Sequence, residues 1–350
     1  MEIKSLVREN ILNLVPYSSA RSSHLDGILM DANENSFGSV VEDTNSLQLN
    51  RYPDPYQKNI RAKLGEYLNV NKENICFGVG SDEIIDLLIR IFCEPRIDKA
   101  MILQPTYGMY KVACDINNVE AINADLTESF QIDFEKVKNN YSDDVKIIFL
   151  CTPNNPTGNL INKSDIIKLA QSYNSIIAVD EAYIDFSESN SLCGEISNYK
   201  NIVLIRTFSK AWGLAGIRCG YCIADELIVD LFMKVKAPYN VNKFIFHSIN
   251  EAINNSKIKN NFIDEIINER ERMKAELINL KGIIKVYNCD ANFILFKCEN
   301  SKTVLEKLSE NGIIIRDRSN HKFLEDCLRV TIGTNEENKI FLKTVKEILC

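Results

Sequence analysis

The sequence predicts an α/β protein: a large domain with a mostly parallel seven-stranded sheet between helices, plus a smaller α+β domain. From about residue 57 to residue 236, short apolar runs alternate with longer amphipathic stretches, a pattern typical of parallel strands joined by covering helices. After Pro238, two long helical stretches precede a series of strands, which indicates a second, α+β unit. We expect residues 1–40 to form an N-terminal arm that packs with the small domain, residues 41–240 to form the large domain, and residues 241–350 to form the small domain.

Each expected strand of the large sheet is a short run rich in β-branched or other apolar residues. These runs are 75–79, 99–103, 120–122, 145–151, 176–179, 202–206 and 220–224. Amphipathic stretches between them, such as 84–92 and 165–173, are expected to be helices. In the small domain the expected helices are 241–255, 262–280 and 334–349, and the expected strands are 283–287, 292–297, 313–316 and 327–332.

Length, charge and composition are those of an ordinary globular protein with small-molecule partners. Of the 350 residues, 45% are hydrophobic and 25% are charged, which allows a large core in about two domains. The net charge of −7 argues against a nucleic-acid partner, which requires a basic face. No run approaches the ~20 apolar residues of a membrane helix, and residues 1–13 lack the unbroken apolar stretch of a signal peptide. We therefore expect a cytoplasmic protein that does not bind a membrane.

Eleven cysteines are scattered through the chain, mostly in apolar surroundings, which indicates reduced and mostly buried thiols. Cys219 and Cys222 have the Cys-x-x-Cys spacing of redox and zinc sites. A zinc site would need a second pair of ligands, and His24, His247 and His321 are far apart in the sequence. We favour a buried strand for this segment over a redox or zinc site, and we expect no bound metal.

Polar residues follow several expected strands, at the edge where ligands of open parallel sheets bind. After the first strand, Gly80 leads into a helix that starts near Ser81, and the backbone N–H groups of a helix start favour an anion. After the fourth strand, two prolines and Gly158 hold Asn155 in a rigid turn. Helix capping for Ser81 and turn formation for Asn155 are the alternatives.

Two further strand ends carry charge. Asp180 follows four apolar residues, where a carboxylate needs a cation, and a structural arginine or a protonated pyridine nitrogen would serve. Lys210 comes after the apolar run 201–205, with Ser209 beside it and Arg218 eight residues further on. A lysine amine forms a Schiff base with an aldehyde, and the other two side chains suit a phosphate, so the set fits pyridoxal phosphate. Exposure to solvent as ordinary surface cations is the alternative for Lys210 and Arg218.

The order and spacing of these segments resemble a known family. Asn155-Pro156-Thr157-Gly158, Asp180-Glu181-Ala182-Tyr183, and Ser209-Lys210 followed by Arg218 are similar to the signature of fold-type I, pyridoxal-phosphate-dependent aminotransferases. Further segments, from about Val15 to the C-terminus, resemble the histidinol-phosphate aminotransferase branch of that family. They are 51–54, 105–110, 182–186, 234–240 and 312–317.

The resemblance implies a role for each matching residue. Lys210, Asp180 and Tyr183 are the expected catalytic residues. Lys210 would form the internal aldimine and move the substrate's proton, and Asp180 would pair with the pyridinium nitrogen. Tyr183 and Asn155 would hydrogen-bond the phenolic oxygen of the ring, and Tyr107 would stack on its face. The expected phosphate contacts are the backbone amides of Ser81 and Asp82, the side chains of Ser209 and Arg218, and Tyr52 reaching over from the neighbouring subunit of a homodimer.

The resemblance also implies the substrates. Arg329 would bind the α-carboxylate of glutamate and, in the other half-reaction, the phosphate of histidinol phosphate, with Arg316, Tyr17 and Asn155 as further contacts. The implied ping-pong reaction converts L-glutamate and imidazole-acetol phosphate to 2-oxoglutarate and L-histidinol phosphate, in histidine biosynthesis. The sequence does not show how the imidazole ring is recognised. Candidate contacts are Ser22, Ser23, His24, Asn33, Glu34 and Tyr110, and an ordinary surface or loop position is the alternative for each of them. An aromatic or broad-specificity aminotransferase, a threonine-phosphate decarboxylase and a non-enzymatic scaffold are the alternatives.

Overall fold

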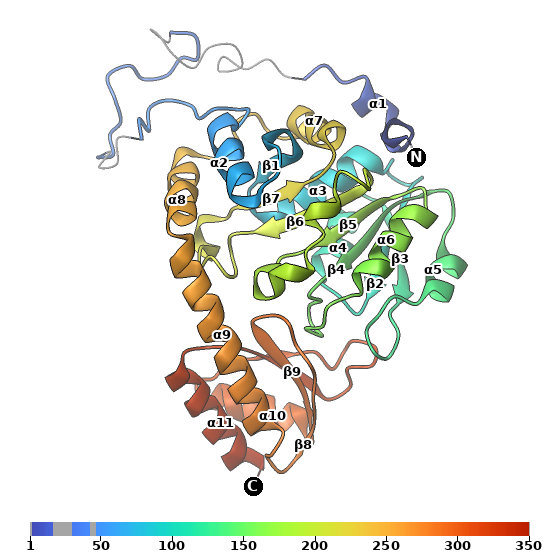
Figure 1. Cartoon of the computed structure of the whole chain (residues 1–350), viewed down its shortest axis with the longest axis vertical. Helices are drawn as coiled ribbons and strands as arrows, with labels where there is room; N and C mark the ends of the chain where they lie inside the picture. Colours follow the sequence, from blue (N-terminus) through green and yellow to red (C-terminus); the bar gives the residue numbers. More distant parts are fainter. Residues whose placement is uncertain (1, 17–29, 43–46, 350) are drawn as a thin grey trace.

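The computed structural model describes residues 2–16, 30–42 and 47–349, and its central feature is a seven-stranded sheet (Figure 1). The strand order is β1-β7-β6-β5-β4-β2-β3, and only β7 runs antiparallel to its two neighbours. The strands are β1 (Ile75–Gly78), β2 (Lys99–Gln104), β3 (Glu120–Asp125), β4 (Val145–Cys151), β5 (Ile176–Asp180), β6 (Ile202–Thr207) and β7 (Gly220–Ile223). The predicted α/β class, with a mostly parallel large sheet, is confirmed.

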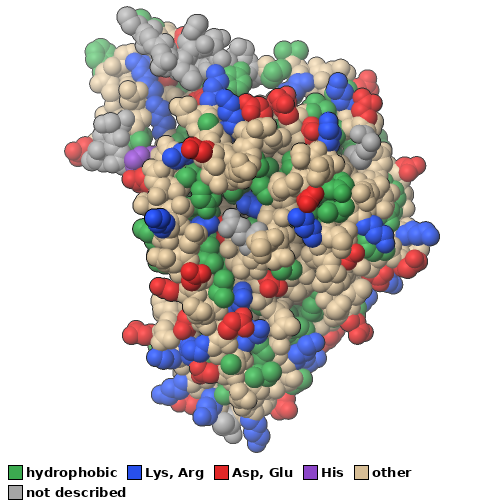
Figure 2. Space-filling view, in the orientation of Figure 1, with side chains coloured by type: hydrophobic (Ala, Val, Ile, Leu, Met, Phe, Trp, Pro, Cys, Tyr) green, Lys and Arg blue, Asp and Glu red, His purple; other side chains and the backbone are tan. Residues whose placement is uncertain are grey.

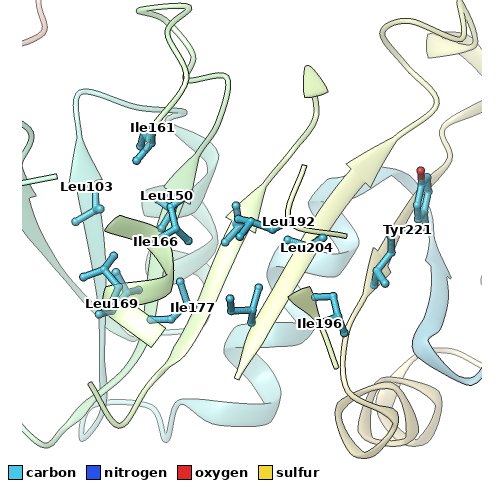
Figure 3. Packing of buried hydrophobic residues seen from close by; sticks show 14 of the residues in the cluster. Leu103, Leu150, Ile161, Ile166, Leu169, Ile177, Leu192, Ile196, Leu204 and Tyr221 are labelled. Atoms are coloured by element: carbon cyan, nitrogen blue, oxygen red, sulfur yellow. The ribbon is translucent and has the colours of Figure 1, made fainter. Parts of the chain in front are cut away.

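Helices cover both faces of this sheet. They are α2 (Lys58–Leu68), α3 (Gly80–Phe92), α4 (Met109–Ile116), α5 (Phe134–Asn140), α6 (Lys163–Ser172) and α7 (Glu226–Val235), with short 3-10 turns η3 (Lys72–Asn74), η4 (Ile184–Asn190), η5 (Cys193–Glu195) and η6 (Ala215–Ile217). Side chains alternate between the faces, so Ile177 and Val179 of β5 pack with α6, while Ile176 and Ala178 pack with α3 and α7. Figure 3 shows the first of these two cores, where Ile166 and Leu169 of α6 lie over the sheet.

The same alternation decides the question raised by the cysteine pair. Cys219 belongs to the core on the α6 face, whereas Cys222 belongs to the core on the α3 face. Both side chains are fully buried, and Cys222 lies opposite Cys76 of β1. The segment is therefore a buried strand, as predicted, and its two cysteines cannot share a metal ion or a disulfide.

The second sheet has four antiparallel strands in the order β10-β11-β9-β8. Its elements are α8 (Lys243–Asn254), α9 (Ser256–Leu277), β8 (Ile283–Val286), β9 (Phe293–Cys298), α10 (Ser301–Glu310), β10 (Arg316–Asp317), β11 (Cys327–Thr331) and α11 (Asn335–Leu349). Helix α9 runs from the large sheet to the small one, where it packs with α11 and β9 (Figure 1). The strand predicted at 313–316 is shorter, because only Arg316 and Asp317 pair with β11.

Helix α8 packs differently from what its place in the sequence indicates. It contacts α2, and Ile245, Ile249 and Ile253 are buried in the core on the α6 face of the large sheet. The apolar face of α8 therefore completes the large core, although the helix comes after residue 240.

The N-terminal residues lie on the large sheet's side of the molecule. Elements η1 (Ile3–Leu6) and α1 (Glu9–Leu12) bury Ile3, Leu6 and Ile11 in the core that contains α3 and α7. The Nζ atom of Lys234, on α7, donates hydrogen bonds to the carbonyls of Ile11 (3.0 Å) and Leu12 (2.9 Å). The expectation that the arm packs with the small domain is therefore wrong for these residues, because their apolar side chains find partners on α3 and α7.

The surface carries charges of both signs. On the face shown in Figure 2, lysine and arginine side chains are interspersed with aspartate and glutamate. Within the described parts of the chain, no helix has the length and apolar character needed to cross a membrane.

Candidate active site

One cavity lies beyond the carboxyl ends of β1, β4, β5 and β6, where the sequence places its polar strand ends. Its lining residues are Ser81, Asp82, Tyr107, Cys151, Asn155, Asp180, Ala182, Tyr183, Thr207, Ser209, Lys210, Ala215 and Arg218. Of the ten residues expected to bind the cofactor, all but Tyr52 line it. Cys151 and Thr207 were not anticipated, although each is the last residue of an expected or observed strand.

Asp180 is a buried carboxylate at the end of β5. Its Oδ2 atom accepts a hydrogen bond from the hydroxyl of Tyr110 (2.8 Å), and its Oδ1 atom accepts one from the backbone N–H of Ala182 (3.0 Å). Burial raises the pKa of Asp180 to about 6, and the hydrogen bond from Tyr110 opposes that rise. Among the described residues no lysine or arginine forms a salt bridge with it. The carboxylate is thus prepared to receive a cation from the cavity.

Tyr110 has a different position from the one suggested for it. Its side chain is fully buried, stacked on Phe149 with ring centroids 5.0 Å apart, and its hydroxyl is bonded to Asp180. It lies behind the cavity wall, edge-on to Tyr107. Tyr110 therefore cannot contact the imidazole ring of a substrate, which corrects that expectation.

Hydrogen-bond donors gather at the start of α3. Gly80 has a φ of +76°, and a Cβ atom there would lie 2.7 Å from Nη2 of Arg218, so the glycine allows the arginine to lie against the helix start. The Nη2 atom is 3.4 Å from Oδ2 of Asp82. The hydroxyl of Ser209 lies beside that of Thr207 at 3.0 Å. A helix N-terminus, a guanidinium and a hydroxyl together are suited to a phosphate group.

Lys210 lines the cavity between Asp180 and the start of α3. Its Nζ atom lies 5.5 Å from the centre of the Tyr183 ring. Burial lowers the pKa of Lys210, the positive charges of Arg329 and Arg218 lower it further, and Asp180 acts in the opposite direction. This environment favours the neutral amine, which is the form that can act as a nucleophile or a base.

A chain of hydrogen bonds links the large sheet to the small one across the site. Nη1 of Arg329, on β11, donates to Oδ1 of Asn155, and Nδ2 of Asn155 lies 3.4 Å from the hydroxyl of Tyr183. The Arg329 guanidinium also lies over the Phe293 ring, 4.9 Å from its centre. Arg329 is therefore held at the edge of the cavity although it comes from the other sheet.

The remaining expected residues do not line the cavity. Arg316 is exposed and lies directly opposite Arg329 on the neighbouring strand. Tyr52 stacks on Tyr239, with ring centroids 4.4 Å apart, and is half exposed outside its own chain's cavity. Glu34 accepts hydrogen bonds from Arg51 and from the backbone of Tyr52.

Four residues with expected substrate roles, Tyr17, Ser22, Ser23 and His24, fall outside the described residues, while Asn33 is described and does not line the cavity. Within the described ranges, no group of three or more histidine, cysteine, aspartate or glutamate side chains is arranged to hold a metal ion.

Comparison with known proteins agrees with this geometry. The sequence profile of the family "Aminotransferase class I and II" matches residues 26–345, and the chain belongs to this family of pyridoxal-phosphate-dependent enzymes. The histidinol-phosphate aminotransferase of Flavobacterium johnsoniae is 44% identical over 351 residues, covering 99% of this chain and 98% of that protein.

Solved structures give the same picture. The crystal structure of the histidinol-phosphate aminotransferase from Clostridium acetobutylicum superposes with a TM-score of 0.79 at 31% identity, covering 86% of this chain and 91% of that one. The enzyme of the same name from Sinorhizobium meliloti, solved in complex with pyridoxal 5'-phosphate, has a TM-score of 0.77 at 21% identity and covers 91% and 89% of the two chains. The latter similarity supports the fold.

Proposed function

We propose that this chain is a histidinol-phosphate aminotransferase of histidine biosynthesis, with pyridoxal phosphate as its cofactor. It would transfer the amino group of L-glutamate to imidazole-acetol phosphate in two half-reactions that share one site. One observation carries the proposal. A single cavity contains a buried carboxylate without a salt-bridge partner, Asp180, and a cluster of hydrogen-bond donors suited to a phosphate at the start of α3. Lys210 lies between the two.

The residues present fit this cofactor. The Asp180 carboxylate suits a protonated ring nitrogen, because burial without a salt-bridge partner makes a positive charge favourable there. Arg218, Ser209 and the first N–H groups of α3 suit the phosphate. The ring of Tyr107 could stack on the ring of the cofactor. The hydroxyl of Tyr107 donates a hydrogen bond to Oδ1 of Asp82 (3.3 Å), which holds the tyrosine ring in place. When bound, the cofactor supplies an aldehyde that takes up amino groups and a ring that accepts the electron pair left when a proton departs.

The side chains of this protein would then bind, orient and move a proton. The Nζ atom of Lys210 would accept the proton from the Cα atom of the amino donor and pass it to the aldehyde carbon of the cofactor. In the second half-reaction it would move a proton the opposite way, from that carbon to the Cα atom of the new amino acid. Asp180 keeps the ring nitrogen protonated. Asn155 and Tyr183 orient the phenolic oxygen, and Arg329 binds the α-carboxylate of glutamate with its planar guanidinium.

The substrate assignment is supported by the full-length similarity to histidinol-phosphate aminotransferases and by a surplus of arginine beside the cavity. Arg329 and Arg316 lie opposite each other on adjacent strands, so both can reach one anionic group. Tyr17 is proposed as a further contact from outside the described residues.

We further propose a homodimer in which Tyr52 completes the phosphate site of the neighbouring subunit. In support, Tyr52 does not line the cavity of its own chain, and residues 37–41, which precede it in the sequence, expose large apolar side chains. Phe37 and Val40 are fully exposed and Val41 is 60% exposed, which favours burial against a second copy.

The proposed activity is tested by half-reactions of the purified, cofactor-loaded protein. Glutamate should bleach the visible absorption band, and imidazole-acetol phosphate should restore it faster than phenylpyruvate does. A Lys210→Ala variant should bind the cofactor without turnover. Undiminished transamination by that variant would overturn the assignment, and faster recovery with phenylpyruvate would leave an aromatic aminotransferase instead.

The shared site is tested by mixing two inactive variants. In a mixed dimer of Lys210→Ala and Tyr52→Ala subunits, one site carries both defects and the other carries neither if Tyr52 acts across the interface. Activity should therefore rise well above that of either variant after subunit exchange. If Tyr52 acts within its own chain, both sites stay defective and no activity returns.

A further inference from the structure

The hairpin of β10 and β11 presents three arginines on one face of the small sheet. Arg316 lies opposite Arg329, and the backbone N–H of Arg318 donates to the carbonyl of Cys327 (2.9 Å), which extends the same pairing by one step. Side chains two apart on a strand share a face, so Arg318 lies on the face of Arg316 and Arg329. Sequence reasoning assigned no role to Arg318.

This face is the one that turns toward the large sheet. Leu295, which pairs with Arg329, is buried in the core of the large sheet, while its neighbours Ile294 and Phe296 are buried in the core of the small domain. The charge of Arg318 interacts with Arg329 and with Tyr183, which lines the cavity. Arg318 thus lies at the edge of the proposed active site.

The positive charges of this cluster lack matching carboxylates. Among the described residues, no salt bridge joins any of the three arginines to an aspartate or glutamate. The charge of the adjacent Asp317 raises the pKa of Arg318 less than burial and the charges of Arg329 and Arg316 lower it. The Nε atoms of Arg318 and Arg329 are both shielded from solvent without a hydrogen-bond partner. Burial and the neighbouring positive charges lower the pKa of both guanidinium groups. Buried donors without partners are costly, so this face is prepared for an anion.

We propose that Arg318 is a specificity-determining residue, a third guanidinium that binds the phosphate of the phosphorylated substrate together with Arg316 and Arg329. A phosphate monoester offers three acceptor oxygens and close to two negative charges, whereas a carboxylate offers two oxygens and one charge. The third arginine therefore contributes more to the phosphorylated substrate than to glutamate. This inference rests on the proposed function and deepens it.

The test compares two half-reactions of the cofactor-loaded Arg318→Gln variant by rapid-mixing absorbance. The second-order rate constant with histidinol phosphate should fall by about tenfold to a hundredfold, the loss expected for one charged hydrogen-bond donor, while that with glutamate changes by less than about threefold. Arg318→Lys should recover part of the loss. Lys322→Gln is the matched control, because it also removes one positive charge from the loop between β10 and β11. Unlike Arg318, Lys322 forms a salt bridge, with Asp125. This control variant should behave like the unaltered protein.

A binding measurement separates this inference from the proposed function. Calorimetry with inorganic phosphate on the cofactor-loaded protein should give a dissociation constant about tenfold weaker for Arg318→Gln than for Lys322→Gln. Equal losses for both substrates, or unchanged phosphate binding, would overturn the role of Arg318. If the unaltered protein reacts with glutamate but not with histidinol phosphate, the proposed function fails, and the phosphate titration alone then decides whether Arg318 binds phosphate.

Discussion

The hydroxyl of Tyr110 donates a 2.8 Å hydrogen bond to Oδ2 of Asp180, and both side chains are buried. This contact joins α4 to the end of β5 behind the cavity. The hydroxyl donates and the carboxylate accepts, so the hydrogen bond stabilises the charged form of Asp180. It therefore opposes the rise in the pKa of Asp180 that burial causes. Tyr110 is therefore a positioning residue for Asp180 and, through its edge-on contact with Tyr107, for the neighbouring aromatic face.

Replacing Tyr110 with phenylalanine should raise the pKa of Asp180 above its present value of about 6. A smaller fraction of the carboxyl group is then charged at pH 6, so cofactor binding should weaken more at pH 6 than at pH 8.5, where the group is ionised in both proteins. Absorbance titration with pyridoxal phosphate at the two pH values measures this. Tyr107→Phe is the control, since its hydroxyl contacts Asp82. A deficit that is the same at both pH values would contradict the prediction.

Replacing Asp180 with asparagine should stabilise the cofactor-free protein while it abolishes transamination. The folded-state pKa is raised from 3.8 to about 6, so the cost of the buried charge grows between these pH values and is constant above them. At pH 8 this cost is up to about 3 kcal/mol, given about 1.4 kcal/mol per pKa unit. Urea unfolding of both cofactor-free proteins at pH 8 and pH 4 should show a gain at pH 8 that disappears at pH 4. A loss of stability at pH 8 would show that the carboxylate is structural.

Replacing Gly80 with alanine should weaken cofactor binding by at least about tenfold. The new Cβ atom would lie 2.7 Å from Nη2 of Arg218 and displace the guanidinium from the helix start. The positive φ also costs about 1 kcal/mol of stability. Gly213→Ala is the matched control, because Gly213 has a φ of +67° with no atom near its would-be Cβ. It should lose similar stability and keep its cofactor affinity. Equal affinity losses in the two variants would assign the effect to backbone strain alone.

Replacing Arg206 with methionine should destabilise the fold by about 3 kcal/mol without removing any cavity residue. Its guanidinium lies 2.8 Å from Glu181, and the two side chains are 5% and 0% exposed. The single substitution leaves a buried carboxylate with only Ser191 and the backbone of Leu192 as partners. Adding Glu181→Leu should recover part of the loss in thermal unfolding experiments. A double variant that is less stable than the Arg206→Met variant would contradict this prediction and show that Glu181 stabilises the fold even without Arg206.

The elements that could be read from the sequence are those with a strong local pattern. The seven strands of the large sheet lie within a few residues of their predicted bounds, because each is a short apolar run between helical stretches. The residues after four of these strands line one cavity, since parallel strands bring their carboxyl ends to the same edge of a sheet. Strand β10 was predicted too long, because hydrophobicity alone does not reveal where a neighbouring strand offers hydrogen bonds.

The sequence by itself therefore determined the fold class and the set of side chains at the strand ends, because both follow from chain order and local periodicity. Only the tertiary structure decided how those side chains are supported. It placed the hydroxyl of Tyr110 behind Asp180, brought Arg329 from the small sheet to Asn155, and placed Arg318 on the same face as Arg329. The first two relationships depend on packing between segments that are 70 and 174 residues apart in the sequence. The third depends on which face of the hairpin turns toward the large sheet. No local sequence pattern encodes these features.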